Sequence, residues 1–269
     1  MHISADASPS IGEGAFAHNL SSIHAFRFLN RLAMIIRLSR PLNNRVARRP
    51  VLSGVFNLSR IETFRRPLVV GIGGTTRPVS STERALGFAL RGAEESGARV
   101  RLFGGAFLCS LPHYSPDSRE LTDAQRELIE AVRDADALII ATPGYHGGIS
   151  GLVKNALDTL EELRDDERPY LDGRAVGSIV TAYGWQAAGT VLTSLRSIVH
   201  ALRGWPTPFG AAVNTLETRF ETAEHCSDPK VVEQLVTVGQ QASNFALAFG
   251  SHRPDAWHAV KREAVLTGR

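Results

Sequence analysis

Apolar residues form short runs between residues 67 and 250, and longer segments with apolar positions at helical spacing separate these runs. The short runs are bounded by turn-forming residues and predict strands, at residues 68–72, 99–103, 137–142, 175–181 and 208–213. The longer segments predict helices, at residues 81–96, 123–134, 150–163, 187–202 and 230–249. Strands that alternate with helices are typical of a parallel sheet with helices on both faces.

This succession predicts an α/β domain with a doubly wound, five-stranded parallel sheet of order 2-1-3-4-5. In such a sheet the ligand binds at the carboxyl ends of the strands, where the strand order reverses. Here that point lies between the first and third strands. The loops that follow them, residues 73–82 and 143–149, are therefore the predicted ligand-binding segments.

Residues 1–66 lack this alternation and carry ten Arg against Asp6, Glu13 and Glu62. Apolar residues repeat at roughly helical spacing between residues 26 and 38, with Arg interleaved. A membrane-surface helix or a transit-like segment would have this pattern. We favour a disordered extension, or a start codon assigned upstream of Met34. The chain is thus predicted to have an extension at 1–66, a folded domain at 67–250 and a tail at 251–269.

The net charge of +3 on the 269 residues is concentrated in this extension. Residues 67–269 hold 20 basic and 24 acidic residues, so the predicted domain is slightly acidic. Its basic residues are not interleaved with aromatic ones, as they are on many nucleic-acid-binding surfaces. We therefore expect no nucleic-acid partner.

The two cysteines, Cys109 and Cys226, are too few for a disulfide framework and have no neighbours at zinc-ligand spacing. We expect no metal site. No run of about 18 apolar residues predicts a membrane span, and the first residues do not resemble a secretory signal. These features predict a cytoplasmic protein without an integral membrane segment.

The first of the two loops has the composition of a phosphate-binding turn. Residues 73–82 read GGTTRPVSST and lead directly into a helical pattern. A helix N-terminus offers unpaired N–H groups and a positive dipole end to an anion, and Arg77 adds a planar cation. The hydroxyls of Thr75, Ser80, Ser81 and Thr82 can donate to phosphate oxygens. The simpler alternative is a turn in which Ser80 or Ser81 only caps the helix.

The motif narrows the choice of nucleotide. It has no Gly-Lys-Ser/Thr of a triphosphate-binding loop and no complete GxGxxG fingerprint of a dinucleotide site. Triphosphate chemistry is therefore disfavoured.

The second loop, TPGYHGGISG at residues 142–151, combines glycines with a central aromatic residue. We predict an irregular loop whose N–H groups can hydrogen-bond a flat heteroaromatic ring. Tyr145 could pack against the ring or line the substrate side. His146 stands without a second His or carboxylate at ligand spacing, so we expect its backbone to contribute. Lys154 and Asp158, one helical turn apart, are expected to form a surface ion pair.

Taken together, the two loops resemble those of the NADPH-dependent FMN reductase family, which has a flavodoxin-like three-layer sandwich. The first family pattern is G-S/T-x-R-x-x-S-x-N/T, and the matching residues are Gly74, Thr75, Arg77, Ser80 and Thr82. The second is P-x-Y-x-G followed by K-N-x-x-D, and the matching residues are Pro143, Tyr145, Gly147, Lys154, Asn155 and Asp158. The resemblance covers residues 67–250.

The resemblance implies FMN as cofactor and NAD(P)H as hydride donor, in a homodimer or tetramer. It implies phosphate contacts from the first loop and ring contacts from the second, by Thr75, Arg77, Ser80, Ser81, Thr82, Pro143, Gly144, Tyr145, His146 and Gly147. The sequence departs from commoner forms of the family at Thr82, where Asn is frequent, and at residues 144–146, where Glu-Tyr-Asn is frequent. These departures leave phosphate binding intact and bear on substrate preference.

Two further segments are similar to those of flavin reductases that supply two-component monooxygenases. They are LPHYSPD at residues 111–117 and YGWQAAG at residues 183–189. Both follow strands, so Pro112, Tyr114, Gly184 and Trp185 are candidates for the substrate side. The alternatives are a Pro-rich loop and an indole that plugs the domain.

The sequence therefore predicts NAD(P)H-dependent reduction of FMN by hydride transfer, with no catalytic acid or base assigned and a flavin-dependent monooxygenase as a candidate partner. One alternative is an FMN-bound NAD(P)H reductase of quinones, azo compounds or metal oxyanions. Another is a flavodoxin-like electron carrier, which would more often be shorter and strongly acidic.

Overall fold

The computed structural model describes residues 65–118 and 120–250. The chain divides into two units, Met1–Ile61 and Glu62–Arg269, and every described residue belongs to the second. The predicted amphipathic segment at residues 26–38 and the tail at residues 251–269 lie outside the described residues.

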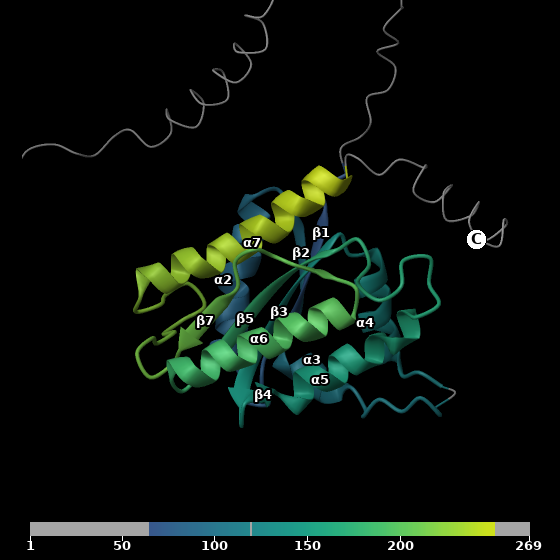
Figure 1. Ribbon diagram of the computed structural model, residues 1–269, viewed down its shortest axis with the longest axis horizontal. Helices are drawn as coiled ribbons and strands as arrows, with labels where there is room; N and C mark the ends of the chain where they lie inside the picture. Colours follow the sequence, from purple (N-terminus) through teal and green to yellow (C-terminus); the bar gives the residue numbers. More distant parts are fainter. Residues whose placement is uncertain (1–64, 119, 251–269) are drawn as a thin grey trace, which may run out of the picture. The chain divides into compact units, whose positions relative to one another are not determined.

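The strands form one mainly parallel sheet at the centre of the described unit (Figure 1). Its order is β2-β1-β3-β5-β6, with β4 beside β3 and β7 beside β5. The strands are β1 (Leu68–Gly73), β2 (Arg99–Phe103), β3 (Ala137–Tyr145), β4 (Gly148–Ile149), β5 (Ala175–Ala182), β6 (Trp205–Pro206) and β7 (Ala211–Asn214). The predicted flavodoxin-like order is confirmed, because β5 is the fourth predicted strand and β6 and β7 together occupy the fifth position.

The predicted number of five strands is wrong, since the described sheet has seven. The fifth position is split because residues 208–210 leave the ladder: Pro208 has no N–H, and Phe209 N donates to Gln241 Oε1 of the last helix (2.9 Å). The other addition is β4, which pairs antiparallel with the end of β3. The third strand therefore runs three residues beyond its predicted end.

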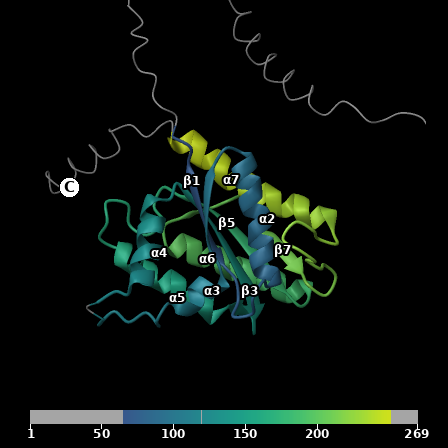
Figure 2. The same ribbon diagram turned by 180° about the vertical axis from the view of Figure 1, so that it is seen from behind.

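Helices cover both faces of the sheet, α2 and α7 on one face and α3, α4, α5 and α6 on the other (Figures 1 and 2). They are α2 (Ser81–Glu95), α3 (Gly105–Ser110), α4 (Asp123–Asp134), α5 (Gly151–Asp158), α6 (Trp185–Ala201) and α7 (Pro229–Gly250). Sequence periodicity missed α3, which is too short to show a period. The helix predicted at 150–163 is α5 followed by a 3-10 turn, η1 (Thr159–Leu163).

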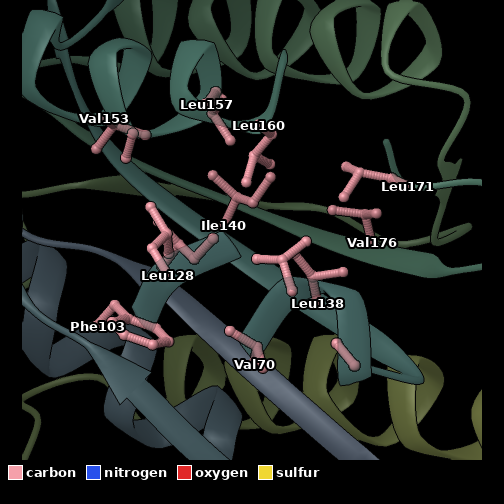
Figure 3. Packing of buried hydrophobic residues seen from close by; sticks show 14 of the residues in the cluster. Val70, Phe103, Leu128, Leu138, Ile140, Val153, Leu157, Leu160, Leu171 and Val176 are labelled. Carbon is pink, nitrogen blue, oxygen red and sulfur yellow. The ribbon is translucent and has the colours of Figure 1, made fainter. Parts of the chain in front are cut away.

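Successive residues of each strand point to opposite faces, so the sheet separates two apolar clusters. Val70, Leu138 and Ile140 pack with α4 and α5 on one face (Figure 3). Val69 and Ile139 pack with α2 and α7 on the other. Because β3 is buried on both faces, its sequence is almost continuously apolar.

Two glycines allow α2 and α7 to approach closely. A Cβ at Gly239 of α7 would lie 1.8 Å from the carbonyl oxygen of Ala89, and a Cβ at Gly92 of α2 would lie 2.5 Å from that of Val236. Both distances are shorter than any real contact, so only residues without a side chain fit at this crossing. At Gly87, also in α2, an added Cβ would have nothing within 4 Å.

This difference predicts opposite effects of the same substitution. Gly239→Ala should lower the free energy of unfolding by about 2 kcal/mol, because the added methyl group forces the helices apart. Gly87→Ala should raise it by up to about 1 kcal/mol, because alanine is the better helix former. Urea unfolding followed by circular dichroism measures both. Equal shifts in the same direction would contradict the close crossing.

Candidate functional site

The loop between β1 and α2 is built on two positions that require glycine. A Cβ at Gly73 would lie 2.2 Å from the carbonyl oxygen of Ala141 in β3, so the two strands can stay paired to their ends only with glycine there. Gly74 has φ +139°, and its Cβ would lie 2.5 Å from Gly105 N. This backbone angle is one that other residues rarely adopt.

Local hydrogen bonds order the rest of the loop. Thr75 Oγ1 accepts from Arg77 N (3.1 Å). Ser80 is the N-cap of α2, and its Oγ accepts from Glu83 N (3.3 Å). The capping role considered from the sequence is therefore present. It satisfies one amide of the first turn and leaves those of Ser81 and Thr82 without an intrahelical acceptor, as an anion-binding helix start requires.

The carboxylate of Glu83 anchors this helix start to the neighbouring segment. Its Oε2 accepts a hydrogen bond from Gly105 N (2.8 Å) at the beginning of α3. A Cβ at Gly105 would lie 2.0 Å from Thr75 O. The loops after β1 and β2 are thus in direct contact.

The second loop is a tight hairpin and not the irregular loop predicted from the sequence. Tyr145 of β3 pairs with Gly148 of β4, which leaves only His146 and Gly147 in the turn. Both have positive φ, 50° and 83°, as a type I′ turn demands. Beyond the hairpin, Ser150 N donates to Thr142 Oγ1 (3.0 Å).

The carboxyl ends of β5 and β7 form a third wall beside these two loops. The hydroxyls of Thr181 in β5 and Thr82 in α2 share a buried hydrogen bond of 2.6 Å. Thr215, which follows β7, donates from its amide to Ala182 O (2.9 Å). The wall is therefore joined both to the helix start and to the sheet.

These three segments enclose a cavity of about 520 Å³, within the range of small-molecule sites. Of the cofactor-binding candidates, those that line it are Thr75, Arg77, Ser80, Ser81, Thr82, Pro143, Gly144, Tyr145 and His146. Gly147 lies at the tip of the hairpin and is not in the lining. Thr76, Tyr183 and Ala187, which also line it, lie within segments singled out from the sequence. Sequence reasoning did not select Thr181, Ala182 and Thr215, which complete the lining.

The lining suits a bound anion. Arg77 is its only Arg or Lys, Ser and Thr supply seven of its residues, and it contains no Asp or Glu. In the described part of the chain, the Arg77 guanidinium has no hydrogen-bonding partner. An FMN phosphate would therefore meet one cation, several hydroxyls and a helix start, while the hairpin backbone would face the ring. The residues present fit this group.

The substrate-side candidates are not in the cavity lining. Pro112 O accepts from Asn155 Nδ2 (2.9 Å), and Tyr114 N donates to Asn155 Oδ1 (2.8 Å), which fixes their loop against α5. Burial, reinforced by the charge of Glu162, raises the pKa of Tyr114. Gly184 and Trp185 lie at the start of α6, next to the lining residue Tyr183.

The family model described as NADPH-dependent FMN reductase matches residues 67–216, which include both loops and the third wall. The chain belongs to the NADPH-dependent FMN reductase family. The predicted resemblance is confirmed, and with it FMN and NADPH as the cofactors of the family. None of the helices in residues 65–118 and 120–250 is long and apolar enough to cross a membrane.

Among curated relatives, the chain is 31% identical over 131 residues to an iron-sulfur flavoprotein of Archaeoglobus fulgidus. It is 36% identical over 94 residues to an FMN-dependent NADPH-azoreductase of Staphylococcus aureus. The matches span 46% and 35% of this chain, and 66% and 46% of the relatives' own lengths. The chain thus spans less than two thirds of each relative.

Two solved structures share the fold at low sequence identity. The apo form of the NADH:FMN oxidoreductase EmoB has 22% identity and a TM-score of 0.51, over 68% of this chain and 89% of that one. The NAD(P)H:acceptor oxidoreductase FerB of Paracoccus denitrificans has 19% identity and a TM-score of 0.54, over 69% and 98%. These likenesses support the flavodoxin-like fold of this family member.

The hairpin predicts two opposite effects on the stability of the apo-protein. Gly147→Val should lower the free energy of unfolding by about 1–2 kcal/mol, because a β-branched residue is strained at positive φ. His146→Asn should raise it slightly, because Asn-Gly is the preferred type I′ pair. Thermal unfolding monitored by circular dichroism tests both, and a valine variant as stable as the parent would argue against the turn.

Proposed function

We propose that this chain is an NAD(P)H-dependent FMN reductase that binds FMN in the cavity between the loops after β1, β3 and β5. The observation that carries the proposal is that two motifs distant in the sequence contribute residues to the same cavity. Two motifs about 65 residues apart in the sequence line one cavity, whose only permanent charge is the cation that a phosphate needs.

Each end of the cavity supports a different part of the ligand. Arg77, the hydroxyls of Thr75 and Ser81, and the free amides at the start of α2 would hold the phosphate. The backbone of residues 144–146 would hydrogen-bond the ring, and Tyr145 would cover one side of it. Ring binding should then tolerate substitution of His146, since only the backbone of this residue contacts the ring.

The reaction needs positioning more than acid-base catalysis. NAD(P)H donates a hydride to FMN, and with one proton from solvent the products are NAD(P)+ and reduced FMN. The lining contains no carboxylate and no paired nucleophile and base. This composition suits a hydride transfer in which the chain holds two rings in contact and excludes water.

A second candidate function is that FMN stays bound and an aromatic acceptor, such as a quinone or azo compound, is reduced. The azoreductase relative favours it over 94 residues, and Tyr145 and Tyr183 offer exposed aromatic surface at the cavity. Delivery of reduced FMN to a monooxygenase, and a homodimer or tetramer, remain predictions. A nicotinamide-independent electron carrier is the least favoured alternative.

Substitution of Arg77 tests the proposed phosphate site most directly. Arg77→Leu should weaken FMN binding by about 10- to 100-fold, the effect of losing a charge-assisted hydrogen bond. Riboflavin has the same ring without the phosphate, so its affinity should change far less. Fluorescence titration of both ligands measures the two constants. Arg126→Leu, on the outer surface of α4, is the matched control. Equal losses for FMN and riboflavin would place Arg77 away from the phosphate.

Turnover assays distinguish the three candidate functions, which are reduction of free FMN, reduction of an acceptor by resident FMN, and electron transfer without nicotinamide. The full chain should oxidise NADH or NADPH in the presence of FMN faster than the flavin-only background, measured by the nicotinamide absorbance. If FMN co-purifies and a quinone accelerates turnover while added FMN does not, FMN is a resident cofactor. Stoichiometric FMN without any nicotinamide oxidation would instead support an electron carrier.

A further inference from the structure

Exposed apolar side chains gather at the third wall of the cavity. Tyr183 and Trp185 after β5, and Leu216 after β7, are each more than half exposed, as is Tyr145 of the hairpin. Tyr183 and Tyr145 line the cavity, and Trp185 and Leu216 are close to lining residues in the sequence. Exposed aromatic side chains that cluster beside a cavity are typical of a binding surface.

Asn214, at the end of β7, holds the segment that carries two of these side chains. Its Oδ1 accepts hydrogen bonds from Gly184 N (2.9 Å) and Leu216 N (3.2 Å). Its Nδ2 donates to Glu217 Oε1 (2.7 Å). Asn214 is only 3% exposed, so these bonds are shielded from competing water.

Glu217 extends this hydrogen-bonding network to the indole. The same Oε1 accepts from Trp185 Nε1 (3.0 Å). Trp185 is therefore fixed by its polar edge while its ring stays exposed, and it does not plug the domain. Gly184, between the two aromatic residues, has φ +99°, a turn that orders the segment without a side chain.

We propose that Asn214 and Glu217 are positioning residues that hold Tyr183 and Trp185 as the binding wall for a flat, uncharged aromatic electron acceptor. The inference rests on the proposed function and assigns the residues that position the acceptor wall of the same site. Two aromatic side chains can stack on a planar ring, and the Glu217 carboxylate disfavours anionic acceptors. A quinone would gain two electrons and two protons, a hydride equivalent from NAD(P)H and one proton from solvent.

The test compares two acceptors at saturating NADPH, the flat quinone menadione and the anion ferricyanide. Glu217→Leu removes the acceptor of the indole N–H, and Trp185→Phe removes the N–H but keeps an aromatic ring. Trp185→Phe should raise KM for menadione about five-fold, as expected when one hydrogen bond is lost, with a smaller change in kcat. Glu217→Leu should raise it at least as much, because it also removes the acceptor of Asn214 Nδ2. The ratio of kcat/KM for menadione to that for ferricyanide should fall accordingly.

Glu217→Gln keeps an oxygen at the same position and should restore most of the menadione KM. The double variant Trp185→Phe/Glu217→Leu should be little worse than Glu217→Leu alone, because Glu217→Leu has already removed the hydrogen bond that Trp185→Phe removes. Glu221→Leu is the matched control, a carboxylate that pairs with His225 on the surface. FMN affinity, measured by fluorescence, reports whether each variant keeps its fold.

An unchanged menadione KM in both single variants, or an equal loss with both acceptors, would overturn the proposal. Parent protein that oxidises NAD(P)H with FMN but does not reduce menadione would also overturn it. Parent protein that oxidises neither NADH nor NADPH in the presence of FMN would refute the proposed function itself, before any variant is compared. The two failures are thus distinct.

Discussion

The site depends on the close contact between β1 and β3 at their carboxyl ends. Gly73 pairs with Ala141 at the last position of the ladder, and the space between them admits no Cβ. Because the two strands stay paired to this point, the phosphate loop begins beside β3, which continues for four more residues into the hairpin, and both segments line one cavity. A larger residue at position 73 would push β1 away from β3 and so separate the two loops that line the cavity.

Two parts of the cavity wall, the phosphate loop and the segments after β5 and β7, are held by different kinds of contact. The contacts that order the phosphate loop are local in sequence, since the helix start, the cap at Ser80 and the hydrogen bond of Thr75 all lie within ten residues. The opposite wall is long-range, because Asn214 and Glu217 reach the segment after β5 across about 30 residues of sequence. Substitutions of Asn214 or Glu217 would therefore leave the local contacts of the phosphate loop in place.

This division also explains what could be predicted. The helix at 123–134 was predicted correctly because its apolar periodicity is a local pattern, and the structure adds a capping box of Thr122 with Gln125 at its start. The phosphate loop was recognisable for the same reason. By contrast, Thr181 and Thr215 carry no local motif, and their place in the lining follows only from the pairing of β5 with β7. The short helix α3 and the split fifth strand likewise depend on tertiary contacts, such as that of Phe209 with Gln241.

The hairpin shows that one local sequence pattern is compatible with two different structures. Glycines around Tyr145 suggested an irregular loop, yet the same residues form a two-residue turn that continues β3. The difference matters for chemistry, because a paired strand end holds its backbone groups in fixed directions and loses little entropy on binding. A ring bound there would meet preorganised amides. The hairpin backbone is thus held by strand pairing, whereas the opposite wall is held by side chains such as Asn214 and Glu217.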